Sequence, residues 1–148
     1  MCWSPGGILL TLDLKPHRTM TPAQPSRPKI FLADDDAALR KALCFSLDLD
    51  GYEVEAFETA EEILDARLPC RSACLVLDLR MPGLNGLEAL SILRSRCVTL
   101  PAVLITSQPD RRTRAEAAAA RITIVEKPLL NRSLIHAIEA ALDGAASG

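Results

Sequence analysis

From residue 29 onward, short apolar runs alternate with stretches in which leucines recur at helical spacing. Four of the runs are almost wholly apolar, which is typical of strands buried on both faces of a parallel sheet. They are KIFLA (29–33), ACLVL (73–77), AVLIT (102–106) and ITIVE (122–126). A fifth run, YEVEAF (52–57), alternates between apolar and polar residues and is predicted to be an edge strand.

Five helices are predicted between and after these strands. Their expected ranges are 37–49, 60–67, 84–96, 110–120 and 130–142. The first helix is the best defined, because Leu39, Leu43 and Leu47 lie four residues apart on one face. Asp36 is a suitable N-cap for its first turn, and Gly51 lies just beyond its end.

Five successive strand–helix units predict an α/β fold, a doubly wound five-stranded parallel sheet of the flavodoxin-like kind. Placing the alternating strand 52–57 at the edge gives the strand order 2-1-3-4-5. The domain is expected over residues 29–142. Residues 1–28 are proline-rich and aperiodic, which predicts a flexible N-terminal tail, and residues 143–148 are expected to form a C-terminal tail. Met20 is a candidate start of the chain, with a functional leader as the alternative.

Polar side chains stand where four of the predicted strands end. These residues are Asp34, Asp35, Asp78, Thr106 and Lys127. Because the carboxyl ends of parallel strands lie on one rim of the sheet, these side chains are expected to converge. Three carboxylates at such short distances from one another cannot all stay ionised without a cation. Oxygen ligands favour Mg²⁺ as that cation. A hydroxyl and an ammonium group opposite the ion form a place for a phosphoryl group.

Composition narrows the classes of partner. The formal charge of −2 gives no general attraction to nucleic acids or anionic membranes, so no direct binding to either is expected. The chain has five cysteines without a CxxC motif and only two histidines, and this composition argues against a zinc site. Free thiols suit a reducing compartment, which favours a cytoplasmic protein. No apolar run approaches the roughly 20 residues that span a bilayer.

The pieces FLADDD, VLDLRMPGLNG, LITS and VEKP, in that order, resemble the receiver domain of bacterial two-component response regulators. The DLRMP run is most similar to the nitrogen-fixation and nodulation regulator branch. The resemblance covers residues 29–142 and depends on four separate motifs that agree in order and position. Any one of the four motifs alone would be weak.

The resemblance implies a role for each residue of the polar rim. Asp78 is the phosphoacceptor, and Asp34 and Asp35 hold Mg²⁺ together with it and with the main-chain carbonyl of Arg80. Asp35 is expected to bind the ion directly and Asp34 through water.

On the phosphoryl side, the resemblance implies that Thr106 donates a hydrogen bond to a phosphoryl oxygen and that Lys127 forms an ion pair with the group. The family usually has the Lys–Pro bond in cis, and the same is expected between Lys127 and Pro128.

A stand-alone receiver of this kind implies a sensor histidine kinase or a histidine phosphotransfer protein as the donor. It implies a downstream protein partner at the face formed by the segments 110–120, 122–126 and 130–142. No external substrate is expected, so the protein is not interpreted as an enzyme, and a homodimer is left open. Two alternatives remain: a degenerate receiver that acts as an unphosphorylated interaction module, and an Asp-based phosphatase of the haloacid dehalogenase type. The phosphatase family places an aspartate where this chain has Arg80.

The chain departs from the receiver pattern in two places. Ile124 occupies the position, three residues before Lys127, where the family usually has an aromatic residue. The segment between Thr106 and Lys127 is about one residue shorter than in close relatives, and Ala120 or Arg121 stands where a glycine is usual. These departures leave the phosphorylation chemistry better supported than the usual route of signal transmission.

Overall fold

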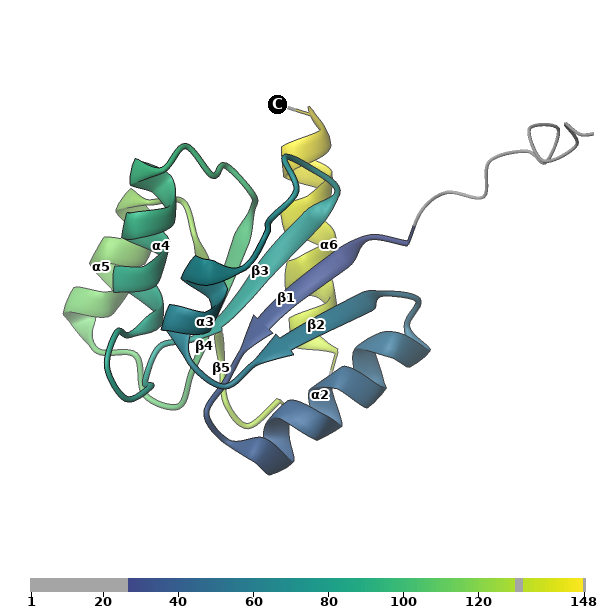
Figure 1. Ribbon diagram of the computed structural model, residues 1–148. Coiled ribbons are helices and arrows are strands. Elements are labelled where there is room, and N and C mark those ends of the chain that lie inside the picture. The colour runs from purple at the N-terminus through teal and green to yellow at the C-terminus, as the bar shows by residue number, and fades with distance from the viewer. Residues whose placement is uncertain (1–26, 130–131, 148) are drawn as a thin grey trace, which may run out of the picture.

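The computed structural model describes residues 27–129 and 132–147 and shows a single sheet with helices on both faces (Figure 1). The strands are β1 (Lys29–Ala33), β2 (Glu53–Phe57), β3 (Ala73–Asp78), β4 (Ala102–Thr106) and β5 (Thr123–Glu126). The helices are α2 (Ala37–Leu49), α3 (Ala60–Asp65), α4 (Gly86–Ser95), α5 (Arg111–Ala119) and α6 (Ser133–Ser147). All neighbouring strands are parallel, and their order β2-β1-β3-β4-β5 confirms the predicted topology.

Two apolar layers hold the helices against the sheet. On one face, α3, α4 and α5 contribute residues such as Ile63, Leu90 and Ala117 to a cluster with Phe31 and Leu75. On the other face, α2 and α6 pack against the alternate residues of the same strands. Every residue of β3 is buried, because this strand lies at the centre of the sheet with helices on both sides. The carboxyl end of β3 is therefore held in place from both faces.

Local capping sets where the helices begin. α2 has the predicted bounds, and the Asp36 carboxylate accepts hydrogen bonds from the backbone N–H groups of Ala38 and Leu39. The predicted start of α4 at residue 84 is wrong by two residues, because Asn85 and Glu88 form a capping box that starts the helix at Gly86. α3 ends at Asp65, two residues before its predicted end.

The two ends of the domain differ from the expected tails. Arg27 already belongs to the fold, because its guanidinium donates hydrogen bonds to the carbonyls of Asp48, Gly51 and Tyr52 near the end of α2. The rest of the predicted tail, residues 1–26, lies outside the described residues. α6 runs to Ser147, so the expected tail boundary at residue 143 falls inside a helix. The predicted start of α6 at residue 130 lies outside the described residues.

Arg121 occupies the position where α5 ends in a left-handed turn. Its φ is 59°, and the N–H groups of Arg121 and Ile122 donate to the carbonyls of Ala118 and Ala117. This is the Schellman pattern, which favours glycine at the left-handed residue. The glycine that the receiver pattern leads one to expect is therefore replaced here by an arginine in a strained backbone conformation.

Arg121→Gly is expected to raise the free energy of unfolding by about 1 kcal/mol, because glycine adopts a positive φ without the steric cost borne by other residues. Urea denaturation measures the change. Arg67→Gly is the matched control, because Arg67 is also an exposed loop arginine but does not have a positive φ. A stability gain in both variants, or in neither, would contradict the assignment of strain to Arg121.

Candidate functional site

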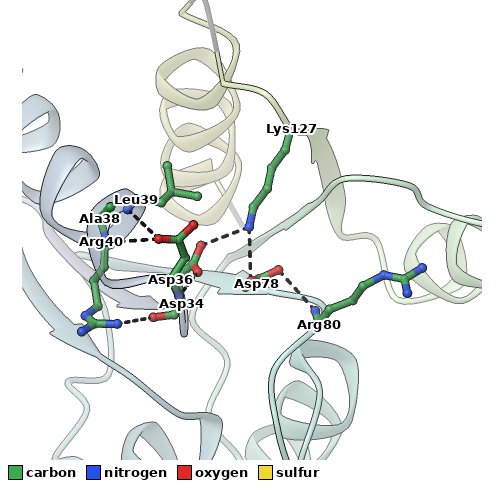
Figure 2. A network of polar contacts seen from close by, with 8 residues as sticks. All are labelled: Asp34, Asp36, Ala38, Leu39, Arg40, Asp78, Arg80 and Lys127. Carbon is green, nitrogen blue, oxygen red and sulfur yellow. Dashed lines mark hydrogen bonds and ion pairs between the residues drawn. The ribbon is translucent and has the colours of Figure 1, made fainter.

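Asp34, Asp78 and Lys127, three of the polar residues predicted to converge, come together at the carboxyl ends of the strands (Figure 2). Asp34 follows β1, Asp78 is the last residue of β3, Thr106 is the last residue of β4, and Lys127 follows β5. Asp34, Asp78 and Thr106 are 0%, 4% and 1% exposed, respectively. Asp35, in contrast, is exposed at the mouth of the site. Burying three polar side chains on one rim costs folding free energy unless each has a hydrogen-bond or ion-pair partner.

Lys127 brings the two buried carboxylates together. Its Nζ lies 3.2 Å from Asp78 Oδ2 and 3.3 Å from Asp34 Oδ2, and Figure 2 shows the side chain reaching down between them. The peptide bond between Lys127 and Pro128 is cis, as the resemblance implied. One positive ammonium group is therefore paired with two carboxylates.

The charges of this cluster shift one another's ionisation. Burial and, after it, the Asp34 carboxylate raise the pKa of Asp78 to about 6, although the Lys127 ammonium and the Arg80 N–H act to lower it. Burial acts against the charged form of Lys127, but the carboxylates of Asp78 and Asp34 outweigh it and raise its pKa. The site therefore has an excess of negative charge that one lysine does not neutralise.

Asp34, Asp35 and Asp78 together fit a hard divalent cation. One carboxylate oxygen from each lies within 4.8 Å of the others. The donor set contains only oxygen, which suits Mg²⁺. Burial and the neighbouring Asp34 charge raise the pKa of Asp78, and a cation bound beside it would favour its ionised form. These three residues are the ones that could hold the ion.

Thr106 supplies a second sign of an incomplete site. Its Oγ1 is buried and has no hydrogen-bond partner among the described residues. A buried hydroxyl without a partner costs about 1–3 kcal/mol, so such groups are rare outside functional sites. Ser107 follows it and is exposed, which leaves the surface beside the hydroxyl uncrowded by a large side chain.

The chain matches the response regulator receiver domain over residues 30–139. It belongs to this family. The chain is 33% identical over 114 residues to the transcriptional regulatory protein TdiR of Thauera aromatica, with 76% of this chain and 50% of TdiR covered. It is 36% identical over 114 residues to FixJ of Bradyrhizobium diazoefficiens, with 76% and 56% covered. The receiver thus spans about half the length of the curated relatives it matches.

A solved receiver structure supports the same fold. The response regulator TrrA of Thermotoga maritima, crystallised in complex with Mg²⁺-BeF, has a TM-score of 0.67 and 26% identity to this receiver. The match covers 77% of this chain and 98% of that one. Phosphorylation and Mg²⁺ binding are typical of the receiver family, and its members work in two-component systems with histidine kinases and downstream partners.

Arg80 lies beside the rim and makes two contacts that the sequence did not predict. Its backbone N–H donates to Asp78 Oδ1 at 3.2 Å, and its exposed guanidinium donates to the carbonyl of Gln108 at 3.4 Å. The loop after β3 and the loop after β4 are thereby joined across the receiver's rim. The expected metal contact of the Arg80 carbonyl stays a prediction.

Three supporting contacts escaped the sequence analysis. Arg40 Nη1 donates to the main-chain carbonyl of Asp34 at 2.6 Å, and the Asp36 N–H donates to Asp34 Oδ1 at 2.9 Å. Gly86 lies so close to β3 that an added Cβ would sit 2.7 Å from the Asp78 carbonyl oxygen. The first two contacts left no signal in the sequence, because each uses a backbone group. No sequence signal distinguished Gly86 from a flexible glycine.

Two further features bear on the receiver's surroundings. Ile124 is half-buried and packs against the layer formed by α3, α4 and α5.

Within the described residues, no helix has the length and apolar character required to cross a membrane.

Stability without divalent ions is expected to fall as pH rises from 4 to above 6. Between the ordinary carboxyl value of 3.8 and the folded value of about 6, the folded Asp78 keeps a proton that the unfolded chain has lost. The folded state thus binds more protons in this window, and the free energy of unfolding declines through it by about 2 kcal/mol. This contribution is lost as pH rises through about 6, and it no longer changes at pH values well above the folded pKa.

Urea denaturation in the presence of a chelator measures this decline, with Asp78→Asn as the reference because asparagine does not titrate. The difference in stability between the two proteins should grow from pH 4 to pH 6.5. A constant difference over that range would show that Asp78 titrates normally in the fold.

Proposed function

We propose that this receiver accepts a phosphoryl group on Asp78 from a phosphohistidine donor and passes the signal to a protein partner. The supporting observation is the placement of one buried carboxylate at the end of the wholly buried β3, with the Lys127 Nζ 3.2 Å away. A strand held on both sides aims the nucleophile, and phosphoryl transfer depends mainly on positioning and charge stabilisation.

In the proposed step, an Asp78 carboxylate oxygen attacks the phosphorus atom. The bond between phosphorus and the donor's imidazole nitrogen breaks, the electron pair leaves with that nitrogen, and the imidazole ring takes up a proton from solvent. The product is an acyl phosphate on Asp78 and a free histidine on the donor. Lys127 pairs with a phosphoryl oxygen, which replaces part of its contact with the Asp78 carboxylate. The partnerless Thr106 hydroxyl donates to another oxygen of the same group.

Asp34, Asp35 and Asp78 are proposed to hold Mg²⁺, together with the main-chain carbonyl of Arg80. Such an ion offsets the repulsion between the carboxylate and the incoming phosphoryl group. The Mg²⁺-BeF complex of TrrA supports this assignment by family likeness. The Asp36 N–H and Arg40 keep Asp34 oriented on the ion's side of the rim.

The proposed donor is a sensor histidine kinase or a histidine phosphotransfer protein in the cytoplasm, and no external substrate is involved. The proposed output surface is the face of α5, β5 and α6. A shallow groove on that face is lined by residues that include Ile124, Glu126 and His136. An isoleucine at this position offers a partner an aliphatic side chain in place of a ring. This domain itself is not proposed to bind nucleic acid.

A small acyl phosphate tests the chemistry without the unidentified kinase. Incubation with acetyl phosphate and Mg²⁺ should add one phosphoryl group per chain, seen by intact-mass spectrometry, and chelation should prevent it. Reduction of the acyl phosphate with borohydride, followed by peptide mapping, should locate the modification at Asp78. Absence of incorporation at saturating Mg²⁺ would favour the degenerate-receiver alternative, and incorporation at another residue would overturn the site.

A further inference from the structure

The loop between Asp78 and Gly86 connects the proposed phosphoacceptor to α4. Packing holds both of its ends: Asp78 ends the buried strand β3, and a Cβ added at Gly86 would lie 2.7 Å from the Asp78 carbonyl oxygen. The middle of the loop has less packing around it, since Arg80, Pro82 and Gly83 are exposed. The polar contacts of this middle part therefore decide how the loop lies beside Asp78.

Glu61, in the first turn of α3, contacts the second half of this loop. Its Oε2 accepts a hydrogen bond from the Leu84 N–H at 3.2 Å. The same oxygen would lie 2.6 Å from a Cβ added at Gly83, so the carboxylate occupies space that a side chain there would need. Gly83 also has a φ of 80°, which glycine adopts without steric cost. Within the described residues, no other hydrogen bond joins this loop to α3.

The first half of the loop is held from the other side. The Arg80 N–H donates to Asp78 Oδ1 at 3.2 Å, and the Arg80 guanidinium donates to the Gln108 carbonyl at 3.4 Å. The second of these bonds is long and exposed, so it restrains the loop only weakly. The main-chain carbonyl of Arg80, proposed above as a metal ligand, thus belongs to a loop whose other half depends on Glu61.

α3 is a firm support for the Glu61 carboxylate. Ala60 and Ile63 are fully buried in the layer between this helix and the sheet, and α3 packs beside α4 (Figure 1). Thr59 and Glu62 form a capping box that fixes the first turn, in which Glu61 lies. The carboxylate that meets the loop is therefore attached to a turn that is both buried on one side and capped.

We propose that Glu61 is a positioning residue for the metal and phosphoryl site, because its hydrogen bond to Leu84 holds the loop after β3 in one conformation. This role rests on the function proposed above, in which the Arg80 carbonyl helps to hold Mg²⁺. A loop that is ordered before the ion arrives loses less conformational entropy when the ion binds. The negative charge of Glu61 is not the cause, since solvent screens a charge at an exposed position.

Three variants of the full chain separate the hydrogen bond from the charge. Glu61→Ala removes both the acceptor and the charge, whereas Glu61→Gln removes the charge and keeps an oxygen that can accept from Leu84. Asp65→Ala removes an equal charge from the same helix, because Asp65 is the exposed last residue of α3. Only Glu61→Ala is expected to change the site.

Mn²⁺ is the probe for the ion, because it suits oxygen ligands as Mg²⁺ does and its free form is measured by electron paramagnetic resonance. Glu61→Ala should bind Mn²⁺ about threefold more weakly than the wild type, as expected for the loss of one exposed hydrogen bond. Glu61→Gln and Asp65→Ala should each match the wild type within about a factor of two.

Hydrogen exchange without metal provides a second readout. The Leu84 N–H should exchange faster in Glu61→Ala than in the other three proteins, because it has lost its acceptor. The amides of β3 should exchange equally in all four proteins, which shows that the variants remain folded, since changes at exposed positions cost little stability.

The proposal is overturned if Glu61→Ala binds Mn²⁺ as tightly as the wild type, or if the wild type binds no Mn²⁺. It is also overturned if Glu61→Gln or Asp65→Ala loses as much affinity as Glu61→Ala, because the effect would then come from charge. Neither measurement depends on phosphoryl transfer. Failure of the proposed function has a different sign: the wild type would take up no phosphoryl group from acetyl phosphate, whatever the order of the Mn²⁺ affinities.

Discussion

Asp78→Asn is expected to abolish incorporation of the phosphoryl group from acetyl phosphate, down to the background of the denatured protein. Asparagine has nearly the size and shape of aspartate, so β3 and its surroundings should be preserved. An amide oxygen is a far weaker nucleophile than a carboxylate and carries no charge to help bind a cation. Incorporation of radioactive phosphate at equal protein concentration measures the loss.

Asp36→Asn is the matched control for this change. Asp36 stands two residues after Asp34 in the acidic run, but its carboxylate serves as the N-cap of α2. Asparagine is an equally good N-cap, so fold and phosphorylation should both survive. Equal labelling of Asp78→Asn and the wild type would refute the assigned acceptor, whereas loss in both variants would point to an unspecific effect of removing acidic charge.

Lys127→Met is expected to lower the free energy of unfolding by about 3 kcal/mol at pH 7.5 in the absence of divalent ions. The change removes the ammonium group that lies within 3.3 Å of both Asp34 and Asp78 and leaves two buried carboxylates facing each other. Methionine keeps the length of the side chain, so lost packing contributes little. Mg²⁺ should restore much of the stability in this variant, because the ion supplies the missing positive charge.

A double variant separates charge repulsion from a general defect. Lys127→Met combined with Asp78→Asn should be more stable than Lys127→Met alone, because only one buried charge remains. Arg67→Met, at an exposed position, should change stability by less than about 0.5 kcal/mol. Urea denaturation with and without Mg²⁺ provides all these values. A Lys127→Met protein as stable as the wild type would show that the carboxylates are already protonated or solvated.

The strands and α2 could be predicted closely from sequence because their signals are strong and local. An unbroken apolar run such as ACLVL has no other favourable place than a central strand. Asp36 and Gly51 mark both ends of α2 with residues that stop a helix for clear steric and hydrogen-bonding reasons. Leucine spacing alone places the start of α4 too early, because the capping box of Asn85 and Glu88 sets where this helix begins.

The sequence predicts which residues lie at the rim for a similar reason: each stands at the end of a strand, and parallel strands end on one side of the sheet. It does not predict the burial and the contacts of each of these residues. Asp34 is expected to bind the ion through water and Asp35 directly, and both binding modes stay predictions. What sequence did not indicate is that Asp34 is fully buried against Lys127 while Asp35 is exposed. Burial of one acidic neighbour and exposure of the next depends on how the loop after β1 turns, and the Asp36 N–H and Arg40 contacts that set this turn involve the backbone.

The complete burial of β3 has a consequence for how the molecule responds to phosphorylation. A strand packed on both faces and bonded on both edges cannot shift without disturbing the whole interior. Asp78, the proposed phosphoacceptor at the end of β3, is thus fixed in place, and a change of conformation is expected in the outer parts of the sheet. β5 is the sheet's last strand on that side, with only Val125 of its four residues buried, and it leads straight into Lys127. We therefore expect two conformational states of this protein to differ at the edge strand β5 and not at the central strand β3.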